Sequence, residues 1–175
     1  LVIVTADLIT FEDEQAVDLR RQIAEITKTS AECVLLNASH THGGPEMRDK
    51  AVYFRSSRDT SSSSRYRQWL QQQLLDAVAQ AAQNLAPGSL WLGCGKTAVN
   101  MNRRLERNGE IVNAPNPDGP VDDRLQVLAL RNQEGQIRAL GIRLSCHPVA
   151  TGAQHLITAD FPGAFKKACA DALGA

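Results

Sequence analysis

Two short apolar runs on either side of one helical period constrain the fold of this chain more than any other feature. The runs span residues 1–8 and 33–36, and between them residues 13–28 carry apolar side chains at spacings of three and four: Ala16, Leu19, Ile23 and Ile26. A strand, a helix and a strand within ~40 residues are typical of a βαβ unit, in which the two strands are parallel. We therefore expect the chain to begin with such a unit.

A second helix is predicted over residues 64–85. Its apolar positions form one stripe that includes Trp69, and Pro87-Gly88 ends the pattern. We expect Trp69 to lie in the core. The preceding residues 46–65 are polar, Ser-rich and aperiodic, which predicts a mobile surface loop and the least ordered part of the chain.

The second half of the chain changes character from helical to strand-like. Residues 90–99, 125–130 and 137–146 have the composition of strands, and Glu134-Gly135 is placed to form a hairpin turn between the last two. Residues 113–120 are rich in Asn, Pro and Gly, which predicts a surface loop, and residues 161–173 predict a closing helix. The fold class is thus mixed α/β, a βαβ start followed by largely antiparallel strands, with helices packed on the sheet.

Bulk composition narrows the class of protein. A chain of 175 residues with 43% hydrophobic and 22% charged residues is expected to form one ordinary globular domain. Nineteen basic and nineteen acidic residues give zero formal charge, which argues against a nucleic-acid partner. The apolar runs are far shorter than the ~20 residues that span a bilayer, so we expect no transmembrane segment. Composition does not indicate an oligomeric state.

The four cysteines are widely spaced and form no Cys-x-x-Cys pair. Cys33, Cys94 and Cys146 each fall in a strand-like run, where a free cysteine usually behaves as a small core hydrophobe, so we assign them no chemistry. The chain begins on Leu1 with neither an initiator Met nor a secretory leader, and it stops close to an amphipathic pattern. We expect a trimmed or partial product with more protein following it.

Three of the four histidines directly follow predicted strands. His40 and His42 follow the strand at 33–36, and His147 follows the strand at 137–146. Ligands of open α/β sheets bind outside the carboxyl ends of strands, and imidazole is the commonest protein ligand for zinc. A metal site is the simplest interpretation of this placement. The His-x-His motif alone is a weak signal, and a pair of hydrogen-bonded loop histidines with a third that caps a strand is the alternative. Spacing alone leaves open whether His40 and His42 both bind the ion or one of them serves the substrate.

Four segments resemble the neutral, alkaline or non-lysosomal ceramidase family, in the same order along the chain. They are His-Thr-His-Gly-Gly-Pro at residues 40–45, Asn-Met-Asn-Arg at 100–103, Ser-Cys-His-Pro at 145–148 and Thr-Ala-Asp-Phe-Pro-Gly at 158–163. The resemblance extends over most of the chain. It implies a zinc-dependent amidase that splits an N-acyl sphingoid base, such as ceramide or a related lipid, into a fatty acid and an amine. It also suggests a secreted or periplasmic protein.

The resemblance also implies roles for individual residues. His40 and His147 correspond to two ligands of the catalytic Zn²⁺, whereas His42 and Arg103 correspond to residues that line the active site. The other two ligands, a glutamate and a tyrosine, and the serine nucleophile are expected beyond residue 175. The chain is then the N-terminal part of a ceramidase-like domain, spanning residues 1–175, and is expected to be inactive alone.

Other interpretations stay open at this point. The Asn-Pro-Asp-Gly-Pro and Cys-His-Pro segments resemble a bacterial branch that often carries Asn at the nucleophile position, which allows a non-catalytic or differently specific module. Histidines and aspartates at strand ends also build two-metal phosphoesterase sites. Arg103 stands among charged neighbours, as in a solvated turn. Asp7 and Asp160 are placed either to orient a ligating imidazole or to cap a helix or turn.

Overall fold

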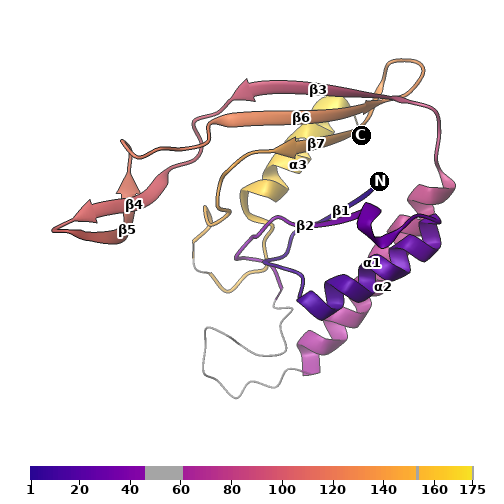
Figure 1. Cartoon of the computed structure of the whole chain (residues 1–175), viewed down its shortest axis with the longest axis horizontal. Helices are drawn as coiled ribbons and strands as arrows, with labels where there is room; N and C mark the ends of the chain where they lie inside the picture. Colours follow the sequence, from indigo (N-terminus) through magenta and orange to yellow (C-terminus); the bar gives the residue numbers. More distant parts are fainter. Residues whose placement is uncertain (46–60, 153, 175) are drawn as a thin grey trace. The chain divides into compact units, whose positions relative to one another are not determined.

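A computed structural model describes residues 1–45, 61–152 and 154–174 (Figure 1). Within these ranges the chain forms three α-helices and seven strands, so the fold is mixed α/β as predicted. The chain divides into two compact units, each treated by itself below. The first comprises Leu1–Leu85 with Pro148–Ala175, and the second comprises Ala86–His147. None of the described helices has both the length and the apolar character needed to cross a membrane.

The first unit opens with the predicted βαβ unit. Strand β1 (Val2–Ala6) pairs in parallel with β2 (Val34–Ala38), with Val2 opposite Val34 and Ala6 opposite Ala38. Helix α1 (Asp13–Thr27) and the short 3-10 helix η1 (Ala31–Cys33) connect them. Asp13 and Glu14 place negative charge in the first turn of α1, where the helix dipole favours it. Both strands therefore end at the same edge, where β2 leads into the His40 segment.

The core of this unit forms between α1, the two strands and helix α2 (Ser61–Gln83). Leu19 and Ile23, four residues apart on one face of α1, are fully buried. They pack with Val4 of β1, Val34 of β2 and Val78 of α2. The middle of the apolar period read from the sequence is thus the buried face of α1, whereas Ile26 near its end is 37% exposed.

Helix α2 differs from its prediction in two respects. It begins at Ser61, so the last residues of the predicted 46–65 loop are helical, whereas residues 46–60 lie outside the described part of the chain. Trp69 is 53% exposed, and the prediction that it lies in the core is wrong. Trp69 lies nine positions before Val78, which at 3.6 residues per turn places the two on opposite faces. Its ring contacts Tyr66 instead, with centroids 5.4 Å apart.

The second unit contains the antiparallel strands. Strands β3 (Ser89–Lys96), β6 (Arg124–Arg131) and β7 (Ile137–Arg143) form a sheet in the order β3-β6-β7. Strands β4 (Asn102–Arg107) and β5 (Glu110–Asn116) form a separate hairpin. The prediction of a loop over 113–120 is therefore wrong for its first four residues. The missed signal is Asn108-Gly109, since both residues have positive φ, as two-residue hairpin turns require.

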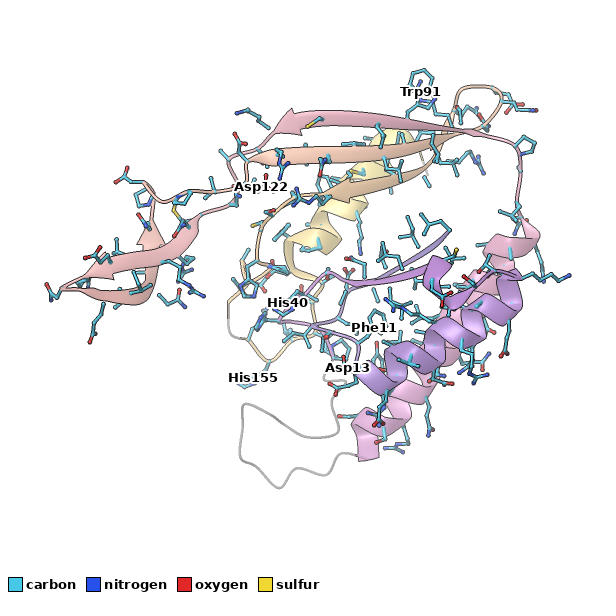
Figure 2. All side chains as sticks on the ribbon, viewed as in Figure 1. Phe11, Asp13, His40, Trp91, Asp122 and His155 are labelled. Carbon is cyan, nitrogen blue, oxygen red and sulfur yellow. The ribbon has the colours of Figure 1, made fainter. Side chains whose placement is uncertain are left out.

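The cysteines are less buried than predicted. Cys33 and Cys94 are exposed and Cys146 is partly buried, so the interpretation of Cys33 and Cys94 as core residues is wrong. All eight residues of β3 are exposed, and Trp91 on this strand can be followed in Figure 2. The reason is that residues 86–147 contain no helix to cover their sheet. Helix α3 (Asp160–Leu173), close to its predicted range, belongs to the first unit.

Candidate metal centre

The structure brings three histidine rings together. His40, His42 and His147 each offer one ring nitrogen, and these nitrogens all lie within 4.8 Å of one another. His147 is the last residue of the second unit, and its peptide bond to Pro148 attaches it directly to the first. The Pro148 carbonyl accepts a hydrogen bond of 3.4 Å from the His42 backbone N–H. The group is exposed to solvent and contains no carboxylate.

His40 is held by backbone contacts at the end of β2. The His40 side chain is labelled in Figure 2. The backbone N–H of His40 donates to the Leu8 carbonyl at 2.9 Å, and its Nδ1 lies 2.8 Å from the Ile9 carbonyl oxygen. A carbonyl only accepts, so Nδ1 carries the proton and Nε2 carries the ring's lone pair. His40 also adopts a left-handed backbone with φ of 65°. For a non-glycine residue that conformation is unfavourable, and the bonds of His40 to Leu8 and Ile9 hold it here.

The rings of His40 and His42 meet edge to face. Their centroids are 5.2 Å apart and their planes are inclined by 85°. Between them Thr41 is fully buried, and its Oγ1 donates to the Thr158 carbonyl at 3.2 Å while accepting from the Gly43 N–H at 3.2 Å. The buried threonine thus fixes the backbone between the two exposed histidines.

The two glycines after His42 allow close backbone approaches. A Cβ atom on Gly43 would collide with the Thr158 methyl group and lie 2.8 Å from its carbonyl oxygen. A Cβ atom on Gly44 would lie 2.9 Å from the Asp7 carbonyl oxygen. The Gly-Gly pair of the sequence thus has a packing role, which keeps the histidine loop against β1 and against the segment before α3.

Asp160 is a buried carboxylate two residues after Thr158, whose carbonyl accepts a hydrogen bond from Thr41 of this loop. It accepts hydrogen bonds from the Ala150 N–H at 3.2 Å, from the Thr151 N–H at 2.8 Å and hydroxyl at 2.7 Å, and from the Phe161 N–H at 2.6 Å. Burial raises the pKa of Asp160, but these bonds to Thr151, Phe161 and Ala150 outweigh burial and lower the pKa to about 2. Asp160 therefore stays charged at neutral pH and holds the backbone of Ala150, Thr151 and Phe161 in place.

Asp7, the other acidic residue expected near the site, forms an ion pair with Lys166. Its Oδ1 lies 2.7 Å from the Lys166 Nζ, and the Asp7 side chain is 25% exposed. The pair connects the end of β1 with α3. Asp7 thus supports the edge of the sheet from which the histidine loop leaves.

Arg103 lies on β4 of the second unit and is exposed. The β4–β5 pairing shifts register between Asn102 and Arg104, so Arg103 sits at the irregularity. The Asn102 side chain accepts from the Arg104 N–H at 2.8 Å and donates to the Pro120 carbonyl at 2.9 Å, which shapes this irregularity. Whether Arg103 lines the histidine site stays a prediction, because the two units are described separately.

The chain has a mixed α/β fold, and its three clustered histidines form a candidate metal site. Solved structures have a similar fold. Neutral ceramidase from Pseudomonas aeruginosa is 21% identical over 90% of this chain and 26% of its own, with a TM-score of 0.61. A ceramidase complexed with C2 is 22% identical over 90% of this chain and 25% of its own, with a TM-score of 0.57. The chain thus has a ceramidase-like fold and spans about a quarter of the length of these structures. No family model matches the sequence, and neither does any curated protein.

Proposed function

We propose that this chain is the histidine-bearing part of a zinc-dependent hydrolase of the neutral ceramidase type. Its reaction is the cleavage of an N-acyl amide bond in ceramide or a related lipid. The observation that carries the proposal is the meeting of His40, His42 and His147 on a fold similar to that of neutral ceramidases. The whole reaction belongs to a longer polypeptide, because the similar structures are about four times the length of this chain.

The donor set fits zinc in type and spacing. Imidazole nitrogens bind Zn²⁺ at ~2.0–2.1 Å, so two nitrogens on one tetrahedral ion lie ~3.4 Å apart. The three ring nitrogens lie within 4.8 Å of one another, so a side-chain movement of roughly 1 Å would bring any pair to that spacing. Bound zinc would supply Lewis-acid polarisation of the amide carbonyl and a water of lowered pKa, about 7.

We assign His40 and His147 as zinc ligands. The Ile9 carbonyl fixes the tautomer and orientation of the His40 ring, as hydrogen-bonded partners usually do for metal-ligating histidines. His147 is held through its peptide bond to Pro148, whose carbonyl is bonded to the His42 N–H. The family resemblance supplies the remaining ligands, a glutamate and a tyrosine, from beyond residue 175.

We assign proton transfer to His42 and anion binding to Arg103. An imidazole titrates near neutral pH, so His42 is suited to give a proton to the leaving amine. A guanidinium offers fixed donors to an oxygen-rich head group or to the oxyanion that develops on the amide carbonyl. In the proposed enzyme Arg103 does this from the irregularity in β4.

The composition of the group favours one ion over two. Two-metal phosphoesterase sites hold ions ~4 Å apart and need bridging oxygen ligands, usually carboxylates. In the described part of the chain the metal-capable group consists of histidines alone, while Asp7 and Asp160 have other bonding partners. A single-ion hydrolase is therefore the better candidate, and a non-catalytic module is an outcome that the following experiment distinguishes.

Replacing His42 by Ala in the natural polypeptide that contains this chain is expected to separate catalysis from metal binding. Loss of a general acid–base group should lower kcat for a short-chain N-acyl sphingosine by about 10²–10⁴-fold. Zinc affinity should fall by no more than about 100-fold, the upper end of the range for residues that surround a metal's ligands without binding the metal. Fatty-acid release and chelator competition measure the two quantities, and His155→Ala is the matched control.

Three outcomes would count against these assignments. Zinc affinity lost as completely in His42→Ala as in His147→Ala would make His42 a ligand. Unchanged kcat in His42→Ala would remove its proton-transfer role. Absence of amide hydrolysis by the zinc-loaded natural polypeptide, on both the sphingosine amide and a simple N-acyl amine, would support the non-catalytic module.

A further inference from the structure

We propose that the short segment of residues 158–160 sets the spacing between the two histidine-bearing loops, with Asp160 as its principal positioning residue. The inference rests on the proposed function, because it gives this segment a part in assembling the metal site. Residues 40–43 form the first loop, and residues 147–152 form the second. The segment that connects them lies just before and at the start of α3.

Thr158 holds the first loop through its backbone. Its N–H donates to the Gly43 carbonyl at 2.8 Å, and its carbonyl accepts from the buried Thr41 hydroxyl at 3.2 Å. In one bond Thr158 is the donor and in the other it is the acceptor, and each bond joins residues more than a hundred positions apart in sequence. Together the two bonds fix the position and the orientation of the loop. Because a Cβ at Gly43 would collide with Thr158, the contact is also a steric limit on how the loop can approach.

Asp160 holds the second loop through its side chain. Three of its four hydrogen bonds go to Ala150 and Thr151, which follow His147 by three and four residues, and only the fourth goes to Phe161 of its own helix. A carboxylate whose only function was to cap α3 would accept hydrogen bonds mainly from the N–H groups of that helix. The direction of the bonds therefore indicates that the loop after His147 is what Asp160 positions.

Hydrogen bonds connect the two loops in two ways, indirectly through residues 158–160 and directly. The Asp160 N–H donates to the Thr158 hydroxyl at 3.0 Å, joining the two halves of the segment. On the far side, the His42 N–H donates to the Pro148 carbonyl at 3.4 Å, so the two loops also touch each other directly. That direct bond is longer than any of the bonds that Thr158 and Asp160 make. The shorter bonds through Thr158 and Asp160 are therefore expected to determine how closely His42 and His147 approach.

The backbone at Asp160 supports a constrained role. Asp160 has φ of 54° and is 6% exposed, so it combines a left-handed backbone with a buried charge. Both features are unfavourable unless the surroundings compensate for them, and the four donors do so here. His40 shares the left-handed backbone, with φ of 65°.

The test replaces Asp160 by Asn, which keeps the shape and tolerates a left-handed backbone but turns an acceptor into a donor facing Thr151. We expect zinc affinity to fall by about 10–100-fold, the range of changes that act through a ligand's supporting shell. In the metal-free protein, nuclear Overhauser contacts between the rings of His42 and His147 should weaken or vanish. Asp18→Asn is the control, because Asp18 is a bonded carboxylate on α1 whose pKa is likewise lowered, chiefly by its hydrogen bond from Arg21, and its bonding partners Arg21, Gln22 and Gln71 belong to neither loop.

A second pair of variants keeps the proposal testable if Asp160→Asn does not fold. Thr151→Val removes only the hydroxyl bond to Asp160, and Thr151→Ser keeps it. One hydrogen bond corresponds to about a two- to tenfold loss of affinity, which Ser should restore. Equal zinc affinity in Thr151→Val and in the parent would overturn the proposal in that case.

The outcomes separate this inference from the proposed function. Parent-like zinc affinity and intact ring contacts in Asp160→Asn would overturn the positioning role while leaving the metal site in place. Equal losses in Asp160→Asn and Asp18→Asn would also overturn it, because they would indicate general destabilisation. If the parent binds no zinc but Asp160→Asn alone loses the ring contacts, the proposed function fails and the positioning role stands.

Discussion

Replacing His147 by Ala in the natural polypeptide that contains this chain is expected to lower its zinc affinity by more than about 100-fold. Changes in the supporting shell of a metal site already cost 10–100-fold, and the loss of a ligand should exceed that range. His40→Ala should have the same effect, since the two rings are proposed to share one ion. Competition with a chromophoric chelator at neutral pH measures both affinities.

The chain supplies its own control for this prediction. His155 is the fourth histidine, exposed and outside the cluster, so His155→Ala should bind zinc as the parent does. It corrects for non-specific binding by surface imidazoles. Comparable affinity in the parent and in His147→Ala would mean that His147 is no ligand, and the zinc assignment would fail.

Ile23→Ala should destabilise the first unit by about 2–5 kcal/mol, because it removes three carbons from a fully buried position and leaves a cavity. Ile23 packs in the core that joins α1, both parallel strands and α2. Domains of this size are stable by only about 5–15 kcal/mol, so the substitution removes a large share of the free energy of unfolding. Loss of this core would also release the strand ends that carry the histidine loop.

The two tryptophans allow the first unit to be followed alone. Trp69 lies on α2 in the first unit, whereas Trp91 lies on β3 in the second. In a Trp91→Phe background, urea unfolding followed by the remaining fluorescence therefore measures the first unit. Val17 is 69% exposed on the same helix, so Val17→Ala should change stability by less than about 0.5 kcal/mol. Equal losses in the two variants would show that the assigned core is wrong.

The fold was most predictable where one residue pattern served both local structure and burial. The apolar spacing of Leu19 and Ile23 predicts α1 and also identifies its buried face, which is confirmed. Trp69 was placed wrongly because an apolar residue on a helix does not reveal which face meets a partner. Cys94 was placed wrongly because a strand pattern assumes a covered sheet, and residues 86–147 supply no covering helix.

The grouping of His40, His42 and His147 could be expected from the sequence, whereas the contacts that hold their loops could not. Parallel strands end at a common edge, so the sequence could place His40 and His42 together on a loop there. The bonds of Thr41 and Asp160 depend on contacts with residues far along the chain or on backbone atoms, and no local spacing encodes them. The relation of Arg103 to the histidines depends on how two units are arranged, which residue patterns do not specify.

X-ray absorption at the zinc edge, on the zinc-loaded natural polypeptide that contains this chain, tests the central claim most directly. The account predicts one equivalent of zinc with nitrogen neighbours at ~2.0–2.1 Å and the multiple scattering that is typical of imidazole, absent in His147→Ala. Two equivalents of zinc, or a shell of oxygen atoms without imidazole scattering, would contradict it.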